Sequence, residues 1–147
     1  RPVEVAVGRG DQTLEAVHVL EASPLFARAT PEQVLHLARI TREVTLAPGS
    51  ALFDEADPAA LYVVASGEAT LETEGAPALR VGPGTTMGVH EALGGVGGGR
   101  ARGEAAGFAL RLEGESFLEL LAGDTALLQG IFGALLEALS PVDARRA

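Results

Sequence analysis

The sequence predicts an α+β domain in which a β-roll or jelly roll (a double-stranded β-helix) is flanked by N-terminal helices and a long C-terminal helix. Three observations favour this fold class. Apolar residues recur at helical spacing near the start of the chain. Short apolar segments closed by Gly or Pro then follow at intervals of roughly ten residues. A long apolar stripe ends the chain, and a length of 147 residues suits one such domain.

The N-terminal part carries signals for helices. Residues 1–12 show no helical pattern and are expected to form a tail or linker. Helical spacing begins at Leu14 and breaks at Ser23-Pro24. Thr30-Pro31-Glu32-Gln33 predicts the start of a further helix, because Thr suits the N-cap, Pro suits the first turn and Gln can complete a capping box. We expect the buried stripe of this helix to be Val34, Leu35, Leu37, Ala38 and Ile40.

The middle of the chain reads as strands. Val44 and Leu46 alternate with polar neighbours, and a turn follows at Pro48-Gly49. Residues 94–99, Gly-Gly-Val-Gly-Gly-Gly, are expected to form a loop, because glycine restricts the backbone least. The further strands expected are 52–53, 61–65 (ended by Ser66-Gly67), 69–73, 79–81 and 108–112.

A short helix is expected over residues 115–122, and a final helix from about Asp124 to Leu139. Asp124 suits the start of that helix because an acid there complements the helix dipole. Ser140-Pro141 is expected to end it, so the domain spans 13–140 and residues 141–147 form a tail. The apolar stripe is expected to pack on the domain's own body, but it also approximates a dimer seam, and a homodimer through this helix is left open.

Composition excludes several classes of function. The net charge of −9 and a pI near 4.7 repel phosphate backbones, so no nucleic acid partner is expected for this chain alone. No apolar run reaches the ~20 residues of a membrane segment, and the start lacks a secretory pattern, so a cytoplasmic location is expected. Cysteine is absent, only His90-Glu91 lies near the roll, and no nucleophile is placed beside a base. Neither a metal site nor an enzyme is therefore expected.

A series of short motifs occurs in a fixed order along the chain. In that order and at those separations they resemble the cyclic-nucleotide-binding domain of bacterial catabolite-activator-type regulators and protein kinase A regulatory subunits. The resemblance covers roughly residues 20–139. The motifs are Pro24-Leu25-Phe26, Pro48-Gly49, Glu55-Ala56-Asp57-Pro58, Leu61-Tyr62-Val63-Val64, Ser66-Gly67-Glu68, Gly82-Pro83-Gly84, Gly88 and Phe117-Leu118-Glu119-Leu120-Leu121.

The resemblance implies a site for the sugar and phosphate of a cyclic nucleotide. In that family a glycine, a glutamate and one helical turn are followed by an arginine and a small residue. The helix N-terminus and the arginine hold the phosphate, and the glutamate binds the ribose. Here Gly88 matches the glycine and Val89 stands at the glutamate position. The implied cassette is Gly88, Val89, His90, Glu91, Ala92, Arg100, Ala101 and Arg102, with Arg102 competing with Arg100 for the arginine role.

Loss of the ribose-binding acid weakens such a site, since an unpaired buried hydroxyl costs about 1–3 kcal/mol. We therefore expect a regulatory or protein-interaction module with weak or lost nucleotide binding, working with other domains of a parent protein. The alternative is a functional cyclic AMP or cyclic GMP sensor of a larger signalling protein. That sensor would use backbone amides near Gly88 together with Arg100 for the phosphate, and Glu91 for the ribose. No cofactor is certain, and Tyr62 is expected to be a core residue.

Overall fold

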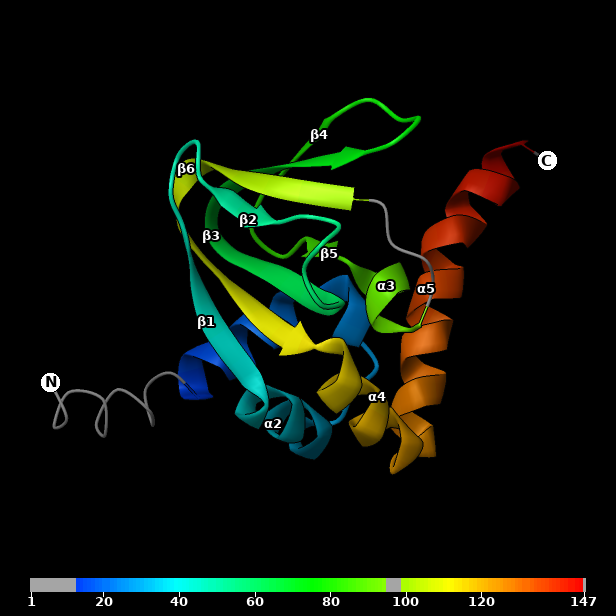
Figure 1. Ribbon diagram of the computed structural model, residues 1–147. Coiled ribbons are helices and arrows are strands. Elements are labelled where there is room, and N and C mark those ends of the chain that lie inside the picture. The colour runs from blue at the N-terminus through cyan, green and yellow to red at the C-terminus, as the bar shows by residue number, and fades with distance from the viewer. Residues whose placement is uncertain (1–12, 95–98, 147) are drawn as a thin grey trace, which may run out of the picture.

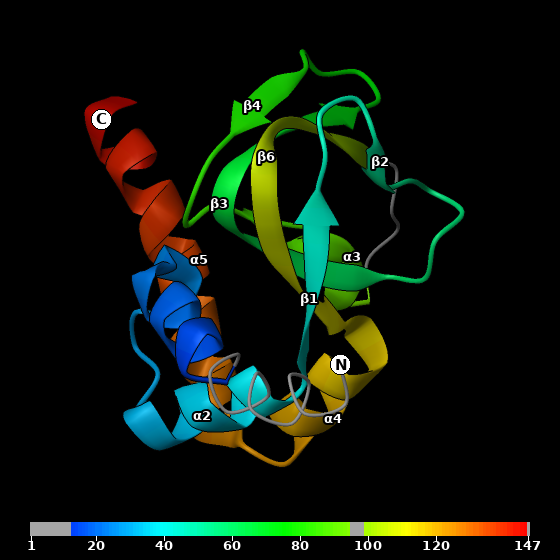
Figure 2. The ribbon, with the colours of Figure 1, turned by 90° about the vertical axis from the view of Figure 1, so that its left-hand side faces the viewer.

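The computed structural model describes residues 13–94 and 99–146, with side chains as far as residue 137. It has the predicted architecture, a β-roll with α2 and α4 below it and α5 along one side (Figures 1 and 2). The predicted tail at residues 1–12 and most of the predicted glycine loop lie outside the described residues.

The first helices follow the predicted capping signals. A helix over residues 13–22 is followed by η1 (Pro24–Phe26) and α2 (Pro31–Arg39). The Thr30 hydroxyl accepts a hydrogen bond from the Gln33 backbone N–H at 3.2 Å, and the Gln33 side chain accepts one from the Thr30 N–H at 2.9 Å. This confirms the capping box. The buried residues of α2 are Val34, Leu37 and Ala38, while Leu35 and Ile40 are half-buried.

The roll is built on two long antiparallel strands. β6 pairs with β1, β2 and β3, and β3 also pairs with β4 and β5. β3 and β6 run together from Ala60 opposite Glu113 to Thr73 opposite Gly99. The strands are β1 (Thr41–Leu46), β2 (Ala51–Phe53), β3 (Ala60–Thr73), β4 (Leu79–Val81), β5 (Thr86–Met87) and β6 (Gly99–Glu113).

The prediction that Ser66-Gly67 ends a strand is wrong, because β3 continues through both residues. The pairing register with β6 shifts on either side of Ser66, so the strand bends into the roll without stopping. Gly67 has φ of +80°, and a Cβ there would collide with the carbonyl oxygen of Ala105. The glycine therefore marks a bend where the two long strands approach closely.

The buried residues form a core on each side of β3. Alternate residues point to opposite faces of a strand, so Leu61 and Val63 face the helices while Tyr62 and Val64 face the interior of the roll. Tyr62 is 4% exposed, which confirms its prediction as a core residue. The core inside the roll also contains Leu46, Phe53, Ala60, Ala69, Val81, Met87 and Ala101. The core under the helices includes Leu20, Phe26, Leu37, Leu110, Leu112, Phe117, Leu127 and Ile131.

The last helices are α4 (Gly114–Ala122) and α5 (Thr125–Arg146). The Asp124 carboxylate accepts the Leu127 backbone N–H at 3.0 Å, so the acid predicted at the start of this helix caps it. The prediction that Ser140-Pro141 ends the helix is wrong, since α5 continues to Arg146. Proline removes one N–H donor, but its fixed φ is compatible with a helix.

α5 packs on the body of the domain through Leu127 and Ile131, each 1% exposed. Its other side bears Phe132 and Leu136, which are 50% and 63% exposed. The predicted intramolecular packing is therefore present, and some of the apolar stripe remains on the surface.

The glycines of α5 make room for an arginine. A Cβ at Gly130 would lie 3.4 Å from the Cβ of Arg28, and one at Gly133 would collide with the Arg28 guanidinium. Arg28 crosses the helix there and reaches the Glu137 carboxylate at 3.0 Å. Gly130 and Gly133 would weaken an isolated helix, but here the absence of their side chains lets Arg28 pack across α5.

No single helix of the described chain is both long enough and apolar enough to cross a membrane. α4 and α5 taken together are long and apolar enough to cross a membrane, but the chain bends by 116° at the break between them.

Candidate functional site: an acidic cavity at the mouth of the roll

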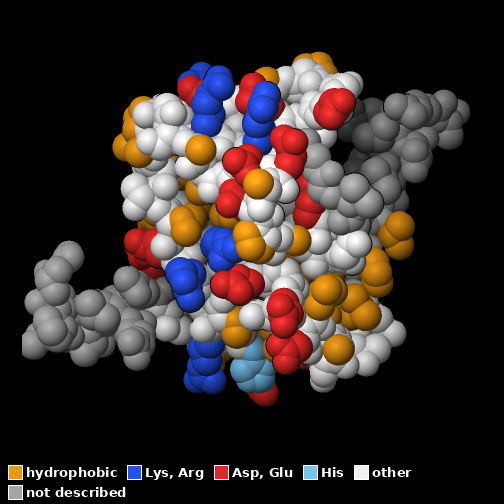
Figure 3. All heavy atoms as spheres, in the orientation of Figure 1, with side chains coloured by type: hydrophobic (Ala, Val, Ile, Leu, Met, Phe, Trp, Pro, Cys, Tyr) orange, Lys and Arg blue, Asp and Glu red, His pale blue; other side chains and the backbone are white. Residues whose placement is uncertain are grey.

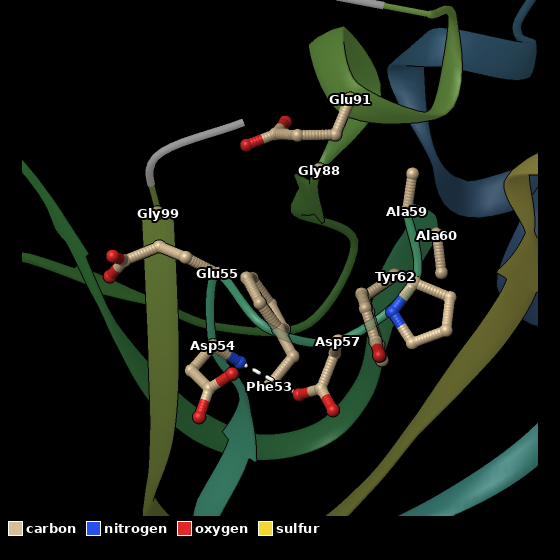
Figure 4. A pocket seen from close by; sticks show the side chains of 11 residues that line it. Phe53, Asp54, Glu55, Asp57, Ala59, Ala60, Tyr62, Gly88, Glu91 and Gly99 are labelled. Atoms are coloured by element: carbon tan, nitrogen blue, oxygen red, sulfur yellow. Dashed lines mark hydrogen bonds between the residues drawn. The ribbon is translucent and has the colours of Figure 1, made fainter. Parts of the chain in front are cut away.

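A cavity of about 130 Å³ opens at the end of the roll where β2, β3, β6 and α3 (Val89–Ala92) meet (Figure 4). This volume is smaller than the ~300 Å³ at which pockets for drug-sized ligands begin. The lining residues are Phe53, Asp54, Glu55, Asp57, Pro58, Ala59, Ala60, Tyr62, Gly88, Glu91 and Gly99.

Aromatic rings form one wall of the cavity. Phe53 and Tyr62 stack with ring centroids 4.6 Å apart and an interplanar angle of 16°. The Tyr62 hydroxyl accepts a hydrogen bond from Nε of Arg111 at 3.1 Å, which fixes the ring from the far side. This wall is rigid because both rings also belong to the core inside the roll.

The turn between β2 and β3 supplies carboxylates. The Asp57 side chain accepts the Asp54 backbone N–H at 2.8 Å, and the Asp54 side chain accepts the N–H of Ala56 at 2.8 Å. Ala56 stands where the resembling family usually has glycine, yet no described non-glycine residue has positive φ. The two aspartates close this turn without a left-handed residue.

α3 brings Gly88 and Glu91 to the cavity. Gly88 has φ of +78°, and a Cβ there would collide with the carbonyl oxygen of Ala60, so only glycine fits. The Glu91 side chain points toward the start of β6 (Figure 4). Its Oε2 lies 3.8 Å from the position a Cβ would take at Gly99.

All charged side chains that line the cavity are carboxylates. No arginine of the described chain lines the cavity. Residues 95–98 are Gly-Val-Gly-Gly and carry no charged side chain. The electrostatic potential of the cavity therefore disfavours an anion such as a phosphate. The carboxylates are Asp54, Glu55, Asp57 and Glu91.

The arginines of the implied cassette lie on the outer face of the roll. Along β6, Gly99 and Ala101 are buried while Arg100 and Arg102 are exposed. Nε of Arg100 pairs with Glu72 at 3.2 Å, and Nε of Arg102 pairs with Glu104 at 3.3 Å. The upper end of the roll accordingly shows basic and acidic side chains side by side (Figure 3). Strand alternation turns both guanidinium groups away from the cavity.

The remaining cassette residues lie around α3. Val89 packs against the core under the helices, His90 is exposed, and Ala92 is fully buried in that core. The structure thus brings Gly88 and Glu91 to the cavity and leaves the other cassette residues outside its lining.

The acidic turn was recognised in the sequence only as a family motif, and its carboxylates were not expected at the site. The signal that could have found them is the density of acids in Asp54-Glu55-Ala56-Asp57 next to an apolar strand. Within the described residues, no group of three or more His, Cys, Asp or Glu is arranged to hold a metal ion.

Outside the cavity, a polar cluster stabilises the outer face of β6. The Thr70 hydroxyl donates a hydrogen bond to the Glu104 carboxylate, which also accepts one from Nε of Arg102. The hydrogen bond from Thr70, with that from Arg102, lowers the pKa of Glu104 below its ordinary value.

No protein-family model matches the sequence, and no curated protein matches it. Solved structures do match. The N-terminal domain of a transcriptional regulator from Streptomyces coelicolor has 28% identity and a TM-score of 0.70, over 86% of this chain and 95% of that one. The catabolite activator protein of Thermus thermophilus has 27% identity and a TM-score of 0.65, over 84% of this chain and 61% of that one.

A more distant match is the regulatory domain of Toxoplasma gondii PKA, solved with cAMP. It has 13% identity and a TM-score of 0.68, over 92% of this chain and 51% of that one, and shows the fold alone. We conclude that this chain is a domain of the cyclic-nucleotide-binding fold, of the type found in catabolite-activator and PKA regulatory proteins.

Proposed function

We propose that this chain is a regulatory or protein-interaction module of the cyclic-nucleotide-binding type whose nucleotide site binds weakly or not at all. The observation that carries the proposal is the charge of the cavity. Carboxylates line it, and the guanidinium groups of Arg100 and Arg102 point to the opposite face of β6. A cyclic phosphate placed there would meet repulsion in place of the charge-assisted hydrogen bonds that a phosphate site needs.

The size of the cavity supports the same conclusion. A volume of about 130 Å³ does not hold a nucleotide without movement of the surrounding turn or helix. Gly88 and the aromatic wall are fixed by close packing, so of these parts of the lining only the acidic turn is left to move.

Calorimetric titration with cyclic AMP and with cyclic GMP tests the proposal. We expect no saturable binding at low micromolar concentration. Arg100→Gln is the informative variant, because a functional sensor would need this arginine for the phosphate, whereas our assignment pairs it with Glu72 outside the cavity. Micromolar binding by the unaltered chain that is lost in Arg100→Gln would establish the alternative, a working cyclic AMP or cyclic GMP sensor.

The proposed partners are other domains of a parent protein, since related domains occur within longer chains. The exposed Phe132 and Leu136 on α5 also leave a homodimer through this helix as a proposal. Light scattering gives the molar mass of the unaltered chain and of a Phe132→Glu variant. A dimer through α5 should dissociate in the variant, whereas a monomer should keep the same mass.

A further inference from the structure

A basic hollow lies at the end of the molecule where α2, β1, β6 and α4 meet, and it shares no lining residue with the acidic cavity. It has a volume of about 350 Å³. Figure 3 shows arginine side chains on the lower left of that face, over the region of β1 and α2. The hollow is lined by Arg39, Ile40, Thr41, Arg42, Arg111, Glu113 and Ser116.

Two of these arginines differ from the other arginines of the described chain. Arg28, Arg80, Arg100, Arg102 and Arg111 each pair with a carboxylate. Among the described residues, Arg39 and Arg42 have no such partner. The chain has 20 acidic and 11 basic residues, so an arginine has many carboxylates available to it. That the unpaired arginines line one hollow is therefore a specific feature of the surface.

Arg111 supplies a third guanidinium in a fixed position. Its side chain is 18% exposed, its Nε donates to the Tyr62 hydroxyl at 3.1 Å, and its Nη1 donates to Glu113 at 3.2 Å. Among the described residues, the second terminal nitrogen, Nη2, has no hydrogen-bond partner. A guanidinium held by its Nε and Nη1 can donate from Nη2 to an oxyanion without losing further side-chain freedom.

The charges in the hollow sum to a cationic site. The three guanidinium groups and the one carboxylate that line it leave a formal charge of +2. The hydroxyl of Ser116 adds a polar group from the first turn of α4, where the N-cap residue Glu113 makes no capping hydrogen bond. Glu43 lines a neighbouring hollow with Arg39 and Arg42 but is within ion-pair distance of neither.

We propose that this hollow binds a phosphate-type dianion, either free or as the phosphoryl group of a phosphorylated side chain. Arg39 and Arg42 supply the unpaired guanidinium groups, Arg111 a fixed one, and Ser116 a hydroxyl. A doubly charged oxyanion matches both the formal charge and the fork geometry of arginine better than a singly charged cyclic phosphate does. The proposal goes beyond the proposed function and does not depend on it, because the two sites share no lining residue and would bind different ligands.

The test is calorimetric titration of the full chain with inorganic phosphate at low ionic strength, beside Arg42→Gln and Arg80→Gln. Arg80 is the matched control because it is an exposed arginine paired with Glu68, outside the hollow. We expect saturable binding of phosphate by the unaltered chain. Arg42→Gln should weaken it about tenfold or more, because a charge-assisted hydrogen bond is lost. Arg80→Gln should leave it unchanged. Thermal melts of both variants establish that each remains folded.

A second arm identifies the source of the dianion. A phosphoserine peptide and its unphosphorylated counterpart are titrated against the same proteins. Tighter binding of the phosphopeptide than of inorganic phosphate indicates a phosphorylated partner, and equal binding indicates a free ion. The proposal is overturned if inorganic phosphate and the phosphopeptide both fail to saturate, if the two arginine variants weaken binding equally, or if the unphosphorylated peptide binds as well as the phosphorylated one.

Discussion

The cavity can be made less negative by two substitutions, at Gly99 and at Glu91. The backbone of Gly99 does not have positive φ, and a Cβ there would meet its neighbours at 3.6 to 3.8 Å, which is ordinary van der Waals contact. A side chain at this position leaves β6 on the inner face, toward Glu91 (Figure 4). Gly99→Arg therefore puts a guanidinium on the cavity side of the strand, where Arg100 does not reach. Glu91→Gln is added so that the new arginine is not neutralised by that carboxylate.

The expected gain in nucleotide affinity follows from Coulomb's law. A guanidinium about 6 Å from a phosphate, at an effective dielectric constant of about 20, contributes roughly 3 kcal/mol. Removal of the Glu91 charge takes away a repulsion of similar range. Solvent screening at the mouth of the cavity lowers both values. We therefore expect Gly99→Arg with Glu91→Gln to bind cyclic AMP or cyclic GMP about 10- to 100-fold more tightly than the unaltered chain.

The assay is calorimetric or fluorescence titration with both cyclic nucleotides at two salt concentrations. Gly99→Gln with Glu91→Gln is the control, because it adds a polar side chain of comparable reach without the charge. A gain that is specific to arginine and shrinks as salt rises supports an electrostatic cause. Equal affinity of the arginine and glutamine versions, with both folded, would show that charge does not limit binding in this cavity.

Further predictions concern stability. Gly67→Ala should destabilise the fold by several kcal/mol, because the new Cβ would collide with the backbone of Ala105. Gly75→Ala, which has a similar positive φ but open space around it, should cost only about 1–2 kcal/mol. Equal losses of unfolding free energy in urea would contradict the collision. Because the pKa of Glu104 is lowered, its contribution to stability is present above the ordinary value of 4.5 and is lost as pH falls through the lowered pKa. Glu104→Gln should therefore reduce the melting temperature more at pH 7 than at pH 3, and an equal reduction at both would refute this. Asp124→Ala should cost about 1 kcal/mol by removing the cap of α5, and Asp124→Asn should retain most of it by circular-dichroism melts.

The sequence was sufficient for the features that depend on local chemistry. The capping box at Thr30 and Gln33 and the cap at Asp124 are decided by residues three apart, so composition at a few positions predicts them. The order of turns and apolar strands was likewise enough to predict the roll, because glycine or proline follows most of the predicted apolar segments.

Element ends were less predictable. Ser66-Gly67 and Ser140-Pro141 are strong local stop signals, yet β3 and α5 continue through them. In β3 the partner strand β6 supplies hydrogen bonds on both sides of the glycine, and a local signal cannot report a partner that lies some forty residues away in the chain.

By itself, the sequence determined the fold and the presence of Gly88 at the mouth of the roll, because both depend on turns whose residues are adjacent. Only the tertiary structure decided the character of the site. It set the register of β6, which turns Arg100 and Arg102 outward and leaves Gly99 on the inner face, and it brought the acidic turn after β2 opposite Glu91. Side chains alternate across a strand, so a shift of one residue moves a charge from the cavity to the solvent, and the pairing of β6 with β3 fixes that choice.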